Sequence, residues 1–340
     1  MGPMTESVVI SGCGWVTPFA AGTIELVLGK ALSLGRPADC ENARWSIPDD
    51  LLAAYKEFPP ELIRDRGTWL AAIALEHARS DARIDASKLE PQRVGLILGD
   101  ALAGQLGMMS FATEVREQTP RFVSPLHFPQ TVGNYTAGAL ARAYSIRGPN
   151  ATIAKRGSSA GLDAVVEGCG LIARGEADLI FAGGLNCMSG ELARGMADPH
   201  AHLADGACLF VLEPASRAET RGVDWLAAVD ITRRLDTASD TTAEAPFLAR
   251  ALPDQPGAIV VAHWIGNCGG ALGAACVAAA IGAGRGYEVP LQDGPSPENF
   301  VATTLCTSVT ARERGAHVKT CVAADGDFGD ESNVTLIIPC

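Results

Sequence analysis

The sequence is short of positive charge and of aromatic side chains. Its 340 residues include 27 Lys and Arg against 39 Asp and Glu, a formal net charge of −12, and only 6% are aromatic. Binding to a phosphate backbone depends on clustered Lys and Arg, so we expect no nucleic-acid partner. The few aromatic residues and the 37 glycines indicate close packing of small side chains, which is typical of α/β proteins.

The sequence also lacks C-x-x-C pairs and a long apolar run. Its 10 cysteines are scattered without zinc-ligand spacing, so we expect small buried thiols, no metal site and no cofactor. The longest stretch of small apolar residues, Gly269 to Gly284, is too short and too rich in glycine to span a bilayer. No basic region precedes an apolar run near the N-terminus. These features predict a soluble cytoplasmic protein without a membrane partner.

Short apolar segments alternate with stretches of helical spacing along the chain. Apolar residues recur with helical spacing over 68–80 and again from Leu162 to Ile172. The first expected strand is 7–12, where a glycine ends the run. It is followed by strands at 94–99, 151–154, 179–184 and 207–213. A second series after Trp225 has expected strands at 257–262, 319–323 and 333–338. This alternation predicts an α/β protein with a mostly parallel sheet covered on both faces, and an internal boundary near 214–226.

The most informative segment runs from Gly148 to Gly184 and reads GPNATIAKRGSSAGLDAVVEGCGLIARGEADLIFAGG. It resembles the nucleophile segment of the β-ketoacyl synthase family, in which a strand, a tight turn that carries a cysteine, and a helix follow one another. Further similarity lies at 8–20, 124–138, 205–213 and 326–333. The resemblance implies an α/β thiolase-like fold with two similar βαβα halves in a layered α-β-α-β-α architecture. Residues 1–220 would form the N-terminal half, with a degenerate nucleophile elbow, and 221–340 a shortened C-terminal half.

The residues that would catalyse condensation are missing from this sequence. In an active synthase the turn carries a thiolate that accepts the acyl chain. Aligned from the strand, that position is Gly157, and aligned from the helix it is Ser158, neither of which supplies a thiolate. Of the family's two histidines, which stabilise the developing enolate, one position holds Gly270, and His263 is the candidate for the other. His263 alternatively has a structural role beside its apolar strand.

The run from Ala160 to Ala164 resembles that of chain-length factors, ketosynthase relatives without the cysteine. This resemblance implies a non-catalytic subunit that pairs with an active ketosynthase, works with an acyl carrier protein and helps to shape the acyl tunnel of type II polyketide or polyene synthesis. Subunit contacts are expected at Asn134 and Tyr135. The carrier would dock on a basic pair, and the tunnel side chains would point inward from a helix or, alternatively, be ordinary core. The basic pairs are Lys155 with Arg156 and Arg233 with Arg234, and the tunnel residues are Met108, Met109, Phe111 and Ala112.

Three other hypotheses use the same turn differently. Ser158 is a candidate N-cap for the following helix, or the nucleophile of an acyltransferase with His263 as its base. Residues 157–161 also fit G-x-S-x-G, which would make Ser159 the nucleophile of a serine hydrolase. The downstream partners of such a hydrolase would come from Asp236, Asp240, Asp254, His263 and His317. A scaffold without an acyl pocket is the remaining alternative.

Overall fold

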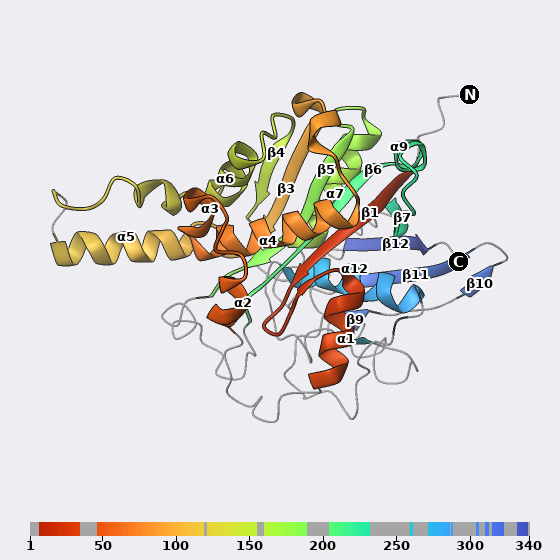
Figure 1. Ribbon diagram of the computed structural model, residues 1–340, viewed down its shortest axis with the longest axis horizontal. Helices are drawn as coiled ribbons and strands as arrows, with labels where there is room; N and C mark the ends of the chain where they lie inside the picture. Colours follow the sequence, from red (N-terminus) through yellow and green to blue (C-terminus); the bar gives the residue numbers. More distant parts are fainter. Residues whose placement is uncertain are drawn as a thin grey trace, which may run out of the picture.

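The computed structural model describes the N-terminal two thirds of the chain most fully. The described residues are 7–34, 46–118, 121–154, 160–188, 204–231, 259–260, 271–285, 287, 304–305, 310–312, 315–322 and 332–338. Within them the structure confirms the mixed α/β content and the layered arrangement (Figure 1).

The strands of the main sheet follow one another in the order β10-β11-β12-β7-β1-β6-β5-β3-β4, with the short β2 paired to β1. Their bounds are β1 Val8–Val16, β2 Ala21–Gly22, β3 Val94–Asp100, β4 Asn150–Ile153, β5 Leu179–Asn186, β6 Gly206–Pro214, β7 Ala227–Ile231, β10 Thr310–Arg312, β11 Gly315–Val322 and β12 Ser332–Ile338. A separate antiparallel pair joins β8 (Ile259–Val260) to β9 (Thr304–Leu305). The expected strands are therefore present within a few residues of their predicted bounds.

The prediction of a mostly parallel sheet was wrong. Among the described strands, the pairs β3–β4 and β3–β5 are parallel. The pairs that join β1, β6, β7, β10, β11 and β12 to their neighbours are antiparallel. The parallel strands are those whose connections carry helices across a sheet face, α6 (Tyr135–Ala143) before β4 and α7 (Ala160–Ala173) before β5. Alternation of strands and helices in the sequence fixes a strand's direction only where the connection crosses in this way.

Two helical layers cover the N-terminal part of the sheet. α4 (Arg66–Asp81) and α6 lie on one face, while α7 and α12 (Leu272–Gly284) lie on the other, where α12 also contacts β11 of the same sheet (Figure 1). The remaining helices are α1 Ile24–Leu34, α2 Asp49–Ala53, α3 Pro60–Ile63, α5 Gln105–Gln118 and α9 Ala215–Thr220, with 3₁₀ turns η1 Ala86–Lys88, η2 Pro91–Arg93 and η3 Phe128–Thr131. β1 is buried along all nine residues, which explains its continuous apolar run.

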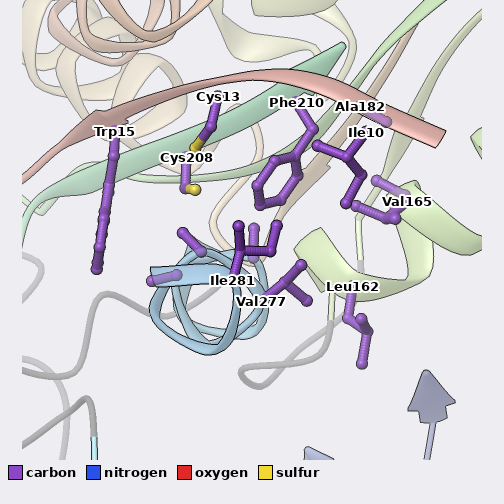
Figure 2. Packing of buried hydrophobic residues seen from close by; sticks show 14 of the residues in the cluster. Ile10, Cys13, Trp15, Leu162, Val165, Ala182, Cys208, Phe210, Val277 and Ile281 are labelled. Carbon is purple, nitrogen blue, oxygen red and sulfur yellow. The ribbon is translucent and has the colours of Figure 1, made fainter. Parts of the chain in front are cut away.

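Trp15 and Phe210 are the bulkiest side chains of the core between the sheet and the pair α7–α12. Figure 2 shows the Phe210 ring above α12, with Val277 and Ile281 of that helix below it and with Cys13 and Cys208 between Phe210 and Trp15. A second core lies under α4 and α6. Each face of the sheet therefore has its own apolar cluster, as expected for a sheet covered by helices on both sides.

Two glycines of β1 allow α4 to lie directly against the strand. A Cβ at Gly12 would come within 2.5 Å of the Ala78 carbonyl oxygen, and one at Gly14 within 1.9 Å of the Ala74 carbonyl oxygen. The strand passes through both glycines and ends at Val16, so the prediction that glycine ends this strand was wrong. Glycine here marks close approach of two backbones rather than a strand terminus.

Helix α4 begins and ends where the sequence predicts. Asp65 accepts hydrogen bonds from the Thr68 amide and the Thr68 hydroxyl, each at 2.7 Å, which satisfies a free N–H group of the first turn. At the other end the Ile84 amide donates to the Arg79 carbonyl at 2.9 Å, and Arg83 takes the left-handed conformation with φ 51°. These bonds form a Schellman C-cap, which directs the chain back toward the sheet.

Candidate functional site

The predicted nucleophile turn connects β4 to α7 at one end of the sheet. α7 begins at Ala160, and a Cβ on Gly99 of β3 would lie 2.2 Å from the Ala160 carbonyl oxygen, so the helix start rests directly on the end of β3. The basic pair and the degenerate nucleophile, Lys155 to Ser159, lie outside the described residues. The capping, acyltransferase and hydrolase hypotheses for this turn therefore stay predictions.

The predicted histidine positions also cannot be placed among the described residues. His263, Gly270 and the basic pair at Arg233 and Arg234 lie outside the described residues. The helix that follows, α12, packs beside α7 in the layer beneath the sheet. Its side with Ala274, Ala275 and Ala278 is completely buried, so the small residues of this segment serve helix packing.

A projecting arm follows β3, and we define it as residues 105–118 and 121–134. Figure 1 shows α5 extending away from the sheet with the return segment beside it. Gly107 is the only buried residue of α5, and a Cβ there would lie 2.1 Å from the Gln130 carbonyl oxygen, so glycine lets the return segment contact the helix base. The arm therefore has little core of its own.

The four predicted tunnel residues lie on this arm, which confirms that they belong to a helix. Met108 and Ala112 are exposed, Met109 and Phe111 are half-buried, and none belongs to either core cluster of the described residues. The alternative that they are ordinary core residues was wrong. Helical spacing in the sequence indicated the helix, but it did not indicate what would cover it.

Large apolar side chains are concentrated on the arm surface. Five of the seven exposed large apolar side chains in the described part of the chain lie here, namely Met108, Phe122, Leu126, Phe128 and Val132, with 45–71% of each exposed. Such a concentration is typical of a surface that takes part in an interaction.

Two side-chain contacts hold the arm together. The His127 Nδ1 lies 2.7 Å from the Glu114 Oε2, and the Ser124 amide donates to the Glu114 Oε1 at 3.3 Å. The Phe111 and Phe128 rings meet edge to face with centroids 5.7 Å apart. The hydrogen bond with His127 lowers the pKa of Glu114 below its usual value, so the carboxylate stays charged near neutrality. The return segment is therefore fastened to α5 at two adjacent points.

Asn134 and Tyr135, the predicted contact residues, lie where the arm rejoins the body at the start of α6. Asn134 is exposed and Tyr135 is half-buried. Tyr135 lines a cavity of about 30 Å³ at the end of β3, which also includes Asp65, Asp100 and Cys187. This volume holds about one or two water molecules, so the cavity is too small for an acyl chain.

Asp100 is a functional candidate that sequence reasoning missed. Burial, with a smaller contribution from the nearby Asp65, raises its pKa to about 6 against the opposing effect of a hydrogen bond from the Leu102 amide. A carboxylate that ends an apolar strand was the available signal in the sequence. Its position between the starts of α4 and α6 links the strand end to the base of the arm.

Asp205 begins the predicted Asp-Gly-Ala motif and is almost fully buried. It accepts hydrogen bonds from the Met188 amide at 2.8 Å, from the Ser46 hydroxyl at 3.0 Å and from the Arg66 Nε at 3.3 Å. These partners come from three separate segments. Asp205 therefore positions the backbone after β5 rather than facing a reactant.

None of the four cysteines whose side chains the structure describes is placed as a nucleophile. Cys13, Cys169, Cys187 and Cys208 are free and buried, which confirms for these four the expected small buried thiols. Burial raises the pKa of Cys169 to about 12, and burial followed by the nearby Asp205 raises that of Cys187. Thiols in such surroundings stay protonated and unreactive.

Two absences concern the residues whose positions the structure describes. No helix among them is long and apolar enough to cross a membrane. No group of three or more His, Cys, Asp or Glu side chains among them is arranged to hold a metal ion.

A family model described as the N-terminal domain of β-ketoacyl synthase matches residues 48–216, which include α4, the arm, α7 and β6. Through this segment the chain belongs to the β-ketoacyl synthase family. A ketosynthase relative, the granaticin polyketide putative β-ketoacyl synthase 1 of Streptomyces violaceoruber, is 28% identical over 266 residues, covering 66% of this chain and 62% of that protein. The chain spans about half to three fifths of the length of two curated ketosynthases that it matches.

Solved ketosynthase structures confirm the thiolase-like fold. The ishigamide ketosynthase/chain length factor superposes with a TM-score of 0.72 at 16% identity, covering 99% of this chain and 100% of that one. A type II polyketide ketosynthase, solved with its acyl-carrier protein, gives a TM-score of 0.58 at 20% identity and covers 68% of this chain and 70% of that one. At these identities the likeness establishes the ketosynthase fold. The division at residues 220 and 221 stays a prediction.

Proposed function

We propose that this chain is a chain-length-factor-like subunit that pairs with an active ketosynthase, does not itself condense acyl units, and lines part of the partner's acyl tunnel. The observation that carries the proposal is the arm, whose large apolar side chains extend into solvent from a segment with few internal contacts. Apolar surface of this kind is unfavourable in an isolated chain and favourable at an interface.

The edge of the main sheet supports the same interface. β4 ends the strand order and, among the described strands, pairs only with β3. Its four residues are exposed or half-buried. The Asn150 side chain donates to the Ala137 carbonyl of α6 at 3.1 Å, which ties this edge to the helix that begins at the base of the arm. An open strand edge offers unpaired backbone groups to a second protein, so one partner would cover edge and arm together.

The non-catalytic part of the proposal rests on the sequence of the turn and on the described thiols. Neither Gly157 nor Ser158 supplies a thiolate, and Gly270 replaces a histidine that the family resemblance places there. The described cysteines are buried. The catalytic alternatives are an acyltransferase that uses Ser158 with His263 as base, and a hydrolase that uses Ser159 with His263 or His317.

The tunnel residues give the proposal its mechanism. Met109 and Phe111 are half-buried on the arm itself, so a partner that covers the arm would enclose them. Once enclosed in close-packed surroundings, their volume would limit the space for a growing acyl chain. We also propose that the carrier protein of the complex docks on Lys155 and Arg156, and that the chain divides at residue 220 into the two predicted halves. The proposal keeps the predicted cytoplasmic location.

The experiment that tests this function is reconstitution with a candidate active ketosynthase, its acyl carrier protein and malonyl units. Product mass and the mass of the protein complex are measured with and without this chain. We expect a heterodimer, condensation that requires this chain, and no change on Ser158→Ala. Met109→Trp should shorten the product, whereas Leu26→Trp, at an exposed apolar position on α1, should leave product length unchanged.

Two outcomes would reject the proposal. Turnover by this chain alone that disappears with Ser158→Ala or Ser159→Ala would favour an acyltransferase or a hydrolase. If the heterodimer forms but its product length does not respond to Met109→Trp, the chain would be a scaffold without a role in the tunnel.

A further inference from the structure

A cavity of about 520 Å³ lies at the opposite end of the sheet from the nucleophile turn. It is bounded by the C-terminal ends of α4 and α6, with Val94 of β3 and Phe181 of β5 among its lining. Val94 is five residues from Gly99, on which the start of α7 rests, so the strand separates the two sites by about 16 Å. The cavity is therefore distinct from the site discussed above.

The apolar walls of this cavity are built by the way two helices end. After α4 the Ile84 amide donates to the Arg79 carbonyl, and after α6 the Ile146 amide donates to the Ala141 carbonyl, at 2.9 and 2.8 Å. Both are Schellman caps, in which the second residue after the C-cap residue packs back against the helix as an apolar contact. Ile84 and Ile146 are those residues, and both line the cavity.

These two caps carry backbone strain that the fold avoids elsewhere. The corresponding left-handed residues after α7 and α9 are Gly175 and Gly222, whereas here they are Arg83, with φ 51°, and Ser145, with φ 56°. In the described part of the chain these are the two non-glycine residues with positive φ. Such strain concentrates where a side chain is retained for a role of its own.

Five polar side chains line the cavity, namely Glu76, Arg79, Ser87, Tyr144 and Ser145. Arg79 Nη2 and Glu76 Oε2 form an ion pair at 2.9 Å, which neutralises both charges. Burial, followed by the nearby Glu76 carboxylate, raises the pKa of Tyr144, so its hydroxyl stays protonated and able to donate. The carboxyl ends of α4 and α6 add partial negative charge, which disfavours an anionic ligand.

We infer that this cavity binds a small uncharged amphiphile, with an apolar body of two or three rings and one hydroxyl or carbonyl group that contacts Tyr144 and the Glu76–Arg79 pair. Its volume and mostly apolar lining fall within the usual range for small-molecule sites. A cavity of roughly 150 Å³ accepts benzene, so one about three times larger accommodates a two-ring compound and its polar group. This inference does not depend on the proposed function.

The test uses the full chain and two probes, 2-naphthol and its anionic counterpart 2-naphthoate, with binding followed by calorimetry and by ligand-observed NMR. We expect 2-naphthol to bind and 2-naphthoate to bind at least tenfold more weakly. Ala143→Trp should fill the cavity and weaken 2-naphthol binding at least tenfold. Ala173→Trp is the matched control, because Ala143 ends α6 and the exposed Ala173 ends α7.

A second variant separates the polar contact from the shape of the cavity. Tyr144→Phe keeps the ring and removes the hydroxyl, so 2-naphthol affinity should fall about two- to tenfold while the fold is unchanged. Absence of 2-naphthol binding to the unmodified chain would overturn the inference. Binding that Ala143→Trp leaves unchanged in a folded protein, or equal affinity for 2-naphthoate, would also overturn it.

Discussion

The body of the molecule and its arm use apolar side chains in opposite ways. In the body, Phe210 and Trp15 are buried between the sheet and α12, and glycines allow backbones to touch. On the arm, rings of similar size stay in solvent and two adjacent contacts join helix to return segment. The difference shows that burial in the body stabilises the fold, whereas the apolar surface of the arm is available for a partner.

Truncating one phenylalanine in each region gives the largest expected contrast. Phe210→Ala should lower the free energy of unfolding by about 4 kcal/mol, because it leaves a cavity in a fully buried cluster. Phe122→Ala removes the same atoms at a position that is 71% exposed. It should change the free energy of unfolding by less than about 0.5 kcal/mol. Urea denaturation measures both, and similar losses would contradict the contrast.

Adding one methyl group sharpens the comparison within the body. Gly14→Ala should lower the free energy of unfolding by about 3 kcal/mol, since the new Cβ would overlap the backbone of α4. Gly29→Ala, in the middle of α1 with nothing within 4 Å of the new Cβ, should raise it by about 0.5–1 kcal/mol. Thermal denaturation compares the two, and a tolerated Gly14→Ala would mean that α4 moves freely from β1.

Asp100 lies where the body meets the arm and gives a pH-dependent prediction. Its pKa is raised from 3.8 to about 6, so the fold disfavours the charged form, and this unfavourable contribution is present above about pH 6 and disappears toward pH 4. Asp100→Asn should therefore stabilise the protein by about 2 kcal/mol at pH 8, with no gain at pH 4. Urea denaturation at both values measures it, and a pH-independent gain would contradict the assignment.

The smallest effect on global stability is expected within the arm. Glu114→Gln weakens the contact with His127, so trypsin should cut after Arg116 and Arg121 several times faster, while the urea midpoint stays unchanged. Glu117→Gln, an exposed carboxylate on the same helix, is the control and should not change the cleavage rate. Equal cleavage of the two variants would mean that the His127 contact does not fasten the arm.

The sequence predicted the elements better than it predicted their surroundings. α4 and the strands β3, β5 and β6 lie close to the expected bounds, because apolar periodicity reports burial directly. Strand direction was wrong, since antiparallel pairing follows from connections that the periodicity does not contain. Gly12 was taken as the end of a strand, although its role depends on a helix more than 50 residues away.

The candidate site was predictable only in part. The motif from Gly148 to Gly184 identified the family and the missing thiolate, because that chemistry depends on a short contiguous segment. The exposure of Met108 and Ala112 could not be predicted, since the same spacing describes a buried helix and a helix that awaits a partner. Asp100 was missed because burial of one carboxylate depends on two helices that begin elsewhere in the chain.

The arm also affects the solubility of the isolated chain. At low salt the net charge of −12 keeps copies of the chain apart through mutual repulsion. Salt shortens the range of this repulsion to about 3 Å at 1 M, while the apolar surface of the arm keeps its attraction. The chain alone should therefore self-associate and precipitate as ionic strength rises, and the partner proposed above should prevent this if it covers the arm as the chain folds.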